Sequence, residues 1–222
     1  MRRFLAPFVL VLCATPLAAC GEGSDDGADG GIALDEPTDP EAWRASAEVT
    51  CKTYTAAQRE TDYARTIAVQ GFDADLGELM EAEFTMTSTL SVDVGAENWT
   101  GVAGTVSTDA AADLEIAFDG TTLAVGSVDA THAHDLGAAD GDNDFDGEGG
   151  DRWTVTGSAT GEPTGTQDVS LLAELATGTF VELEVAGVGS TQVSFDKGAW
   201  AHSALTHAGA EIQVCLRYVP GA

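Results

Sequence analysis

An alternation of apolar and polar residues with a period of two runs through most of the chain after residue 45. It is clearest in residues 81–94 and 212–219, where apolar side chains would occupy one face of a strand and polar side chains the other. Turns rich in Gly and Asp separate about ten short runs of this kind. The pattern predicts an all-β fold, with a single antiparallel β-sandwich domain over residues 41–222.

The predicted strands follow from these runs and from the turn residues that bound them. They are residues 47–55, 64–69, 81–94, 99–106, 113–118, 122–128, 153–159, 169–175, 179–188, 191–195 and 212–219. In the last strand, the residues expected to face the core are Ile212, Val214, Leu216 and Tyr218. Residues 40–49 and 170–176 also fit short helices, so both assignments stay open there.

The first twenty residues have the order of a secretory signal. Arg2 and Arg3 give a positive start, residues 4–12 form an apolar core too short to span a bilayer, and small residues precede Cys20. Residues 17–20 (Leu-Ala-Ala-Cys) resemble the lipobox of bacterial lipoproteins, in which the cysteine is acylated and becomes the first residue of the mature chain. The resemblance implies that residues 1–19 are a signal peptide and that Cys20 carries lipid. Ordinary cleavage with a free Cys20 thiol is the alternative.

Residues 20–40 contain almost nothing apolar. They cannot bury a core, so we expect a disordered, acidic linker between the lipid and the domain. The whole chain has a formal net charge of −28. Nucleic acid and anionic lipid headgroups repel so acidic a chain. We therefore expect no nucleic-acid partner, membrane contact only through the lipid, and a monomer.

The cysteines leave one simple pairing. Cys13 lies within the signal and Cys20 is assigned to the lipid, which leaves Cys51 and Cys215 in the domain. Two cysteines in an exported domain are expected to form a disulfide, here between the first strand and the last. Two buried free thiols are the alternative.

Several segments of the domain follow a pattern seen in a known family. Residues 72–79 (Phe-Asp-Ala-Asp-Leu-Gly-Glu-Leu) precede a long run of alternating Thr and apolar residues, and then Asn98. Residues 144–150 (Asp-Phe-Asp-Gly-Glu-Gly-Gly) form a later loop, and 177–218 includes the closing strands. These segments resemble the choice-of-anchor E domain of exported bacterial proteins. The resemblance implies a surface β domain held by whichever anchor its host uses, and it transfers no activity or catalytic residue.

The most acidic stretch of the domain is a Gly-rich loop. Its aspartates are Asp140, Asp142, Asp144, Asp146 and Asp151. Such a loop can surround one hard cation with carboxylate oxygens, and Ca²⁺ takes roughly six to eight oxygen ligands. Three of the aspartates fit the start of an EF-hand, but Trp153 stands where that motif requires a bidentate Glu. We therefore expect a weaker calcium site of another kind, with a solvated acidic loop as the alternative.

No motif of an enzyme stands out. His132 and His134 could share one face of a strand and bind Zn²⁺, with His202 or His207 as a third ligand, but four ordinary surface histidines are the simpler interpretation. The chain contains no Gly-x-Ser-x-Gly nucleophile elbow. Scattered tryptophans are usually buried. A carbohydrate-stacking surface could nevertheless form from Trp43, Trp99, Trp153 and Trp200.

These features predict a non-catalytic, lipid-anchored protein of the cell envelope, in the outer membrane if the host has two membranes. It would work in adhesion, envelope structure or ligand display, with an extracellular protein or polysaccharide as its partner and Ca²⁺ as a stabilising ion. The alternative is a secreted hydrolase, metal-dependent or carboxylate-based, that acts on envelope polysaccharide.

Overall fold

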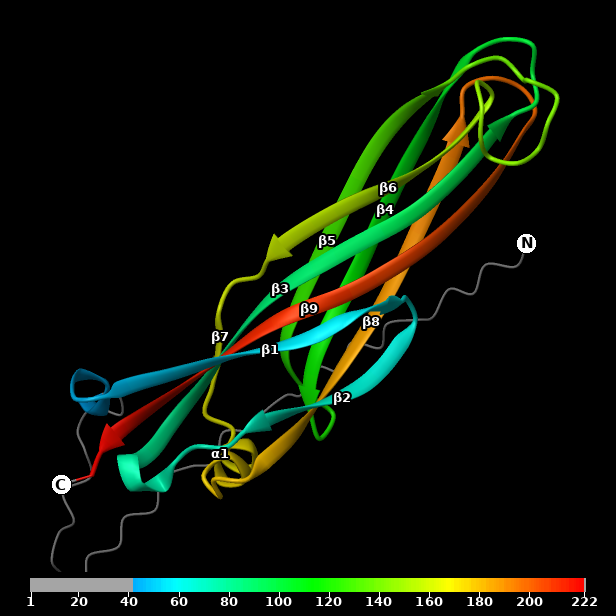
Figure 1. The fold of residues 1–222 in the computed structure, drawn as a ribbon. Coiled ribbons are helices and arrows are strands. Elements are labelled where there is room, and N and C mark those ends of the chain that lie inside the picture. Colours follow the sequence, from blue (N-terminus) through cyan, green and yellow to red (C-terminus); the bar gives the residue numbers. More distant parts are fainter. Residues whose placement is uncertain (1–41, 222) are drawn as a thin grey trace, which may run out of the picture. The chain divides into compact units, whose positions relative to one another are not determined.

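The computed structural model describes residues 42–221 (Figure 1). The predictions for the signal peptide, for lipid on Cys20 and for the linker over residues 20–40 lie outside the described residues. Within residues 42–221, no helix has the length and apolar character needed to cross a membrane.

Two antiparallel sheets form the domain, which confirms the all-β sandwich prediction (Figure 1). Sheet A has the strand order β1 (Glu48–Glu60), β9 (Trp200–Pro220), β3 (Gly77–Asn98) and β6 (Gly150–Thr160), with β7 (Thr164–Thr166) also paired to β3. Sheet B has the order β2 (Tyr63–Gln70), β8 (Phe180–Phe195), β4 (Gly104–Phe118) and β5 (Thr121–Leu136). The first strand and the last therefore lie side by side in sheet A.

Several strands are much longer than the sequence pattern indicates. β3 has 22 residues, which corresponds to about 70 Å of extended chain. The predicted run 113–118 is the end of β4, and 122–128 lies in the first half of β5. The start of 99–106 is a loop before β4. The prediction of many short strands is thus wrong in length, although the alternation itself is correct.

Glycines account for part of this difference. Gly187 and Gly189 lie near the boundary of the predicted runs 179–188 and 191–195, where glycine favours a turn. In the structure both residues belong to β8, and a Cβ atom at Gly187 would lie 2.8 Å from the Tyr63 ring. The missing side chain makes room for that ring on the neighbouring strand and does not end β8.

Residues 169–175 form a helix, so the strand predicted there is wrong and the competing helix is correct. The Asp168 carboxylate caps α1 (Val169–Leu175) by accepting a hydrogen bond from the Leu171 N–H at 2.9 Å. Leu171 and Leu175, four residues apart, are fully buried on one face of the helix. A single 3₁₀ turn, η1 (Ala42–Ala45), precedes β1, and another, η2 (Ala74–Leu76), precedes β3.

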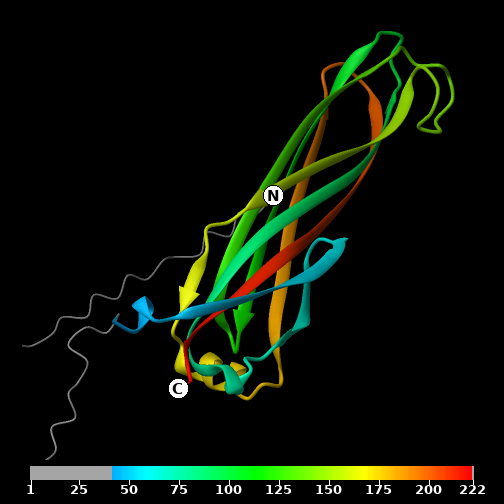
Figure 2. The ribbon, with the colours of Figure 1, turned by 60° about the vertical axis from the view of Figure 1, so that its left-hand side comes forward.

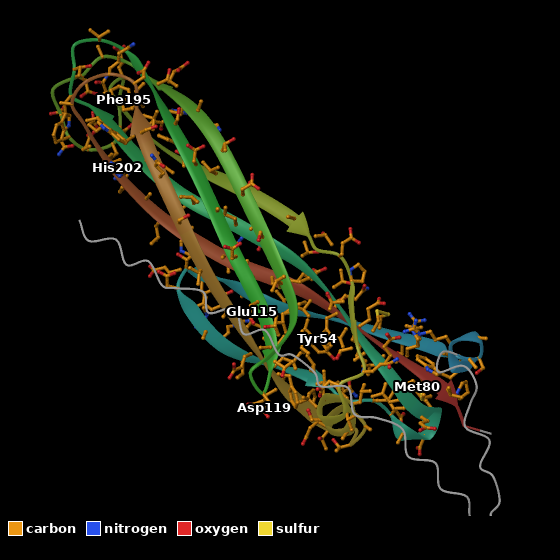
Figure 3. The ribbon with its side chains drawn as sticks, turned by 180° about the vertical axis from the view of Figure 1, so that it is seen from behind. Tyr54, Met80, Glu115, Asp119, Phe195 and His202 are labelled. Carbon is orange, nitrogen blue, oxygen red and sulfur yellow. A yellow bond between two sulfur atoms is a disulfide. The ribbon has the colours of Figure 1, made fainter. Side chains whose placement is uncertain are left out.

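The sandwich narrows toward one end (Figure 2). β1 pairs only with residues 207–218 of β9, and β2 only with residues 180–187 of β8. We name the far end, which holds loops 99–103, 137–149 and 196–199, the loop end. The opposite end, with η1, α1 and the end of β9, is the base. In Figure 3, Phe195 and His202 mark the side of the loop end, and Asp119 lies toward the base.

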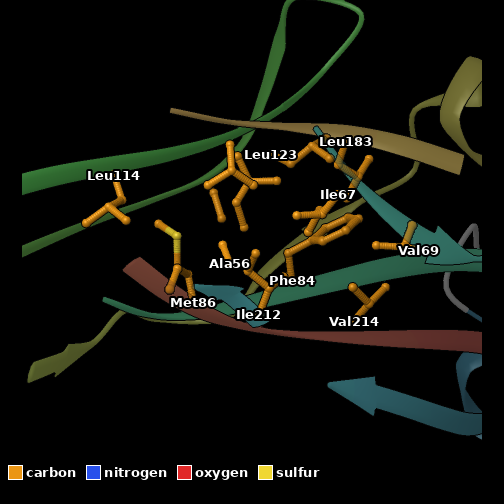
Figure 4. Packing of buried hydrophobic residues seen from close by; sticks show 14 of the residues in the cluster. Ala56, Ile67, Val69, Phe84, Met86, Leu114, Leu123, Leu183, Ile212 and Val214 are labelled. Atoms are coloured by element: carbon orange, nitrogen blue, oxygen red, sulfur yellow. The ribbon is translucent and has the colours of Figure 1, made fainter. Parts of the chain in front are cut away.

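The core lies between the two sheets (Figure 4). Phe84, Met86 and Ile212 from sheet A pack with Leu114 and Leu183 from sheet B, and all five are buried. The predicted core face of the last strand is confirmed, because its four residues are all buried. The polar Gln213 between them is exposed.

Cys51 and Cys215 form the predicted disulfide. Their Cα atoms lie 4.1 Å apart because the two residues are direct partners in the ladder between β1 and β9. The bond closes a loop with a sequence separation of 164 residues. It therefore links the first strand covalently to the last, two strands that are adjacent in sheet A but far apart in the sequence.

Candidate functional site

The three loops at the loop end are hydrogen-bonded to one another. The Ala139 N–H donates to the Thr100 carbonyl at 2.7 Å, and the Trp99 N–H donates to the Ala199 carbonyl at 3.1 Å. The Asn98 N–H donates to the Gly149 carbonyl at 2.9 Å. The three loops, each of which connects one sheet to the other, thus form one surface.

The Asn98 side chain organises this surface. It is fully buried, and its amide donates to the carbonyls of Val102 and Gly137 at 2.8 and 2.6 Å. Its carbonyl accepts from the N–H and the hydroxyl of Thr100 at 2.8 and 2.7 Å. Both ends of the amide are therefore satisfied, and one side chain fixes two loops.

Glu97, the preceding residue, is also fully buried. Strand alternation directs its side chain to the outer face of sheet A, where the acidic loop covers it. The Glu97 Oε2 atom accepts a hydrogen bond from the Phe145 N–H at 2.8 Å. The Oε1 atom is buried and has no hydrogen-bond partner within residues 42–221. A buried carboxylate oxygen without a partner is costly, so this atom needs an explanation.

Phe145 fixes the acidic loop against sheet A. Its backbone is left-handed, with φ of 58°. Its ring lies over Gly95, at 3.4 Å from where a Cβ atom would be, and the Arg152 guanidinium lies 5.2 Å from the ring centroid. This cation–π contact and the Glu97 hydrogen bond hold the middle of the loop on the sheet.

The five predicted calcium ligands lie on the loop or at its end, and all five are exposed. The carboxylates of Asp140, Asp144 and Asp146 accept hydrogen bonds from backbone N–H groups of the loop at 2.8 to 3.3 Å. Asp151 instead lies 2.8 Å from the His134 Nε2 atom. In the described part of the chain, no three His, Cys, Asp or Glu side chains gather where they could hold one ion. Calcium binding therefore stays a prediction.

The histidines lie in three separate places. His134 stacks on Trp153 across the seam between β5 and β6, with ring centroids 4.4 Å apart, and the His132 ring lies 6.1 Å from the His134 ring. His202 stacks on Trp200 at 4.5 Å. The remaining histidine lies on β9 opposite Ser91. The predicted pair is thus adjacent, but neither candidate third ligand joins it.

The tryptophans do not share one surface. Trp99 is 52% exposed at the loop end, beside Val102, which is 61% exposed. Trp153 is half-buried against His134, and Trp43 lies in η1 at the base. A stacking surface made of all four is therefore absent from the described residues. Trp99 and Val102 are thus exposed apolar side chains at the loop end, next to the acidic loop.

A shallow depression of about 440 Å³ lies on the outer face of sheet A near the loop end. Its lining includes Asp93, Arg152, Thr154, Ser203 and Leu205. The Thr154 hydroxyl already donates to Asp93 at 2.9 Å. The depression offers polar groups to a ligand with hydroxyls but contains no paired nucleophile and base.

Similarity to other proteins is slight. No protein-family model matches the chain, and no curated protein is similar to it in sequence. A chain from the structure of the infectious bursal disease virus Gx strain is similar at 16% identity, with 79% of this chain and 38% of that chain covered and a TM-score of 0.18. A chain of an IBDV viral particle is similar at 14% identity, with 80% of this chain and 36% of that chain covered and a TM-score of 0.15.

The chain thus spans less than two-fifths of these two viral chains. TM-scores this low carry no conclusion about the function of this chain. The resemblance to choice-of-anchor E domains stays a prediction.

The sequence pattern did not point to Glu97. Along β3, period-two alternation places Glu97 on the outer face, where a glutamate is usually solvated. Only the tertiary fold reveals that loop 137–149 closes over this face. Asn98 is part of the family resemblance, but its role as the link between loops also follows only from the structure.

Proposed function

We propose that this chain is a non-catalytic, lipid-anchored protein of the bacterial cell envelope that presents its loop end to an extracellular protein or polysaccharide. The lipid would be attached at Cys20, and residues 20–40 would connect it to the domain. The Cys51–Cys215 disulfide supports this proposal, because disulfides persist in oxidising compartments outside the cytosol.

The observation that carries the proposal is the position of the loops relative to the start of the domain. The described chain begins with η1 at the base, and loops 99–103, 137–149 and 196–199 lie at the opposite end (Figures 1 and 2). Long strands such as β3, with 22 residues, separate the two ends. A chain tethered at its base would hold these loops away from the lipid surface.

The loop end has the properties of a contact surface. Hydrogen bonds of Asn98 fix its loops, so they need little ordering on binding. Trp99 supplies an exposed aromatic ring, a residue type that often anchors contacts with proteins and sugars. The aspartates of loop 137–149 would favour a partner that carries positive charge or bound cations.

The test uses bacterial cells that express the full chain. We expect the wild-type chain to partition into the Triton X-114 detergent phase and to be removed when a protease is added to intact cells. The Cys20→Ser variant should fold with its disulfide but stay in the aqueous phase. A Cys20→Ser chain that partitions like wild type, or a wild-type chain that stays inside the cytosol, would contradict the proposal.

A further inference from the structure

One buried carboxylate oxygen near the loop end has no hydrogen-bond partner among the described residues. Within residues 42–221, the buried side-chain oxygens and nitrogens without a hydrogen bond include a single carboxylate oxygen, Oε1 of Glu97. The Glu97 side chain is fully buried. A buried carboxylate oxygen is costly unless a cation or a hydrogen-bond donor contacts it.

The carboxylate of Glu97 is directed into the acidic loop. Its Oε2 atom accepts from the Phe145 N–H at 2.8 Å and lies so close to Gly150 that no side chain would fit there. The preceding residue, Gly149, donates its N–H to the Asp140 carboxylate at 3.3 Å. The buried carboxylate therefore lies against Gly150, and the loop aspartate is bonded to the neighbouring Gly149.

We propose that Glu97 is the buried ligand of a Ca²⁺ ion that binds between the end of β3 and loop 137–149. Glu97 would supply one or both of its carboxylate oxygens from the outer face of sheet A. Asp140, Asp144 and Asp146, together with loop carbonyls and water, would complete the oxygen shell of roughly six to eight ligands that Ca²⁺ takes.

Ion binding requires a small rearrangement of the loop. The loop aspartates now accept hydrogen bonds from N–H groups of their own loop, and they are exposed. They can therefore rotate toward Glu97 without unpacking the core. A Gly-rich loop with many carboxylates suits Ca²⁺ better than Mg²⁺, which demands strict octahedral geometry and keeps its water. This inference does not depend on how the chain is anchored.

The experiment is calorimetric titration of the EDTA-treated full chain with CaCl₂, repeated with MgCl₂, and thermal unfolding in both salts. We expect one saturable Ca²⁺ site with Kd of roughly 0.1–1 mM, as in extracellular modules, and a higher Tm in CaCl₂ than in MgCl₂. Glu97→Gln should weaken Ca²⁺ binding by about tenfold or more, since even residues that only support a ligand commonly contribute that much.

The matched control is Glu184→Gln. Glu184 is exposed on β8 in the other sheet, and its replacement removes the same unit charge. Since a general attraction between Ca²⁺ and this acidic chain would weaken equally in both variants, only a specific site predicts that Glu184→Gln binds as wild type does.

Three outcomes would overturn the proposal. They are no saturable binding by the wild-type chain, equal affinity of Glu97→Gln and wild type, and equal loss of affinity in Glu97→Gln and Glu184→Gln. If Glu97→Gln does not fold, Asp140→Asn replaces it, because this side chain is exposed and the amide keeps an acceptor oxygen. Weaker binding by Asp140→Asn would then support the site, and unchanged binding would overturn it.

Discussion

Among single residues, Asn98 holds the loop end together through its side-chain amide. Asn98→Ala would leave the Val102 and Gly137 carbonyls and the Thr100 N–H without their partners. Because unsatisfied buried polar groups are costly, we expect the free energy of unfolding to fall by about 2–3 kcal/mol in urea denaturation. The exposed Asn143 on loop 137–149 is the control, and Asn143→Ala should change stability by less than about 0.5 kcal/mol. Equal effects of the two variants would contradict the role of Asn98.

Tyr218 gives a prediction about pH. Its hydroxyl donates to Glu48 Oε2 at 2.9 Å, and this hydrogen bond, with a smaller effect of burial, raises the pKa of Tyr218 above its usual value. The stabilisation is therefore complete below pH about 10, where an unfolded tyrosine ionises. It is lost as the pH rises through the higher folded pKa.

Absorbance titration of the tyrosines measures this effect. In Glu48→Gln we expect the pKa of Tyr218 to move down toward the ordinary value. Burial is the main cause that raises the pKa of Tyr63, so that residue should titrate as before and serves as an internal reference. Superimposable titration curves of the two proteins would refute the assigned cause.

Among the strands, Gly126 of β5 tests the packing between the sheets. A Cβ atom there would collide with the Ser88 hydroxyl and lie 3.0 Å from the Met86 side chain, both on β3. We expect Gly126→Ala to lower the free energy of unfolding by about 1–2 kcal/mol, because overpacking outweighs the gain in strand propensity. Gly101→Ala, where a Cβ atom meets nothing within 4 Å, should stay within about 0.5 kcal/mol of wild type. A stabilised Gly126→Ala variant would show that the sheets lie farther apart.

The disulfide between β1 and β9 tests how the two terminal strands are joined. Replacing Cys51 and Cys215 by Ala should lower the free energy of unfolding by about 2–4 kcal/mol, chiefly because the unfolded chain gains freedom. Urea denaturation with and without a reductant checks this. Reductant should destabilise the wild-type chain to the level of the double variant and leave the double variant unchanged. Wild-type stability that does not respond to reductant would contradict the predicted contribution.

The elements differ in how far the sequence predicts them. Alternation identifies β3 and the core face of β9 because each has one buried and one solvated face. It fails for α1, where a capping aspartate and two leucines at helical spacing decide the local structure. It also fails at Gly187, because a glycine that accommodates a neighbouring ring has the same sequence signal as a turn.

The candidate site is predictable only in part for a related reason. Counting the cysteines finds the pair Cys51 and Cys215, and composition finds the acidic loop. The burial of Glu97 cannot be predicted from its sequence neighbours. It results from loop 137–149, which folds over the end of β3 and bonds Glu97 through Phe145, 48 residues away. Contacts of that kind are set by topology and not by local pattern.

For the whole molecule, the proposed function combines a lipid anchor at Cys20 with a contact surface at the loop end of the domain. The base begins at η1, and the loops stabilised by Asn98 lie beyond the narrow end of the sandwich (Figure 2). The formal net charge of −28 over the whole sequence would keep the protein soluble and discourage its collapse onto anionic headgroups. In this proposal, the tether would hold the protein at the membrane while its charge keeps the domain off the headgroups.

Mass spectrometry of the mature N-terminal peptide is the most direct test. The chain would be purified from membranes of bacterial cells that express the full sequence. We predict that the first residue is Cys20, with a mass increased by two or three acyl chains, enough to hold a protein stably at a bilayer. A mature chain that begins at another residue, or a Cys20 of unmodified mass, would contradict the account.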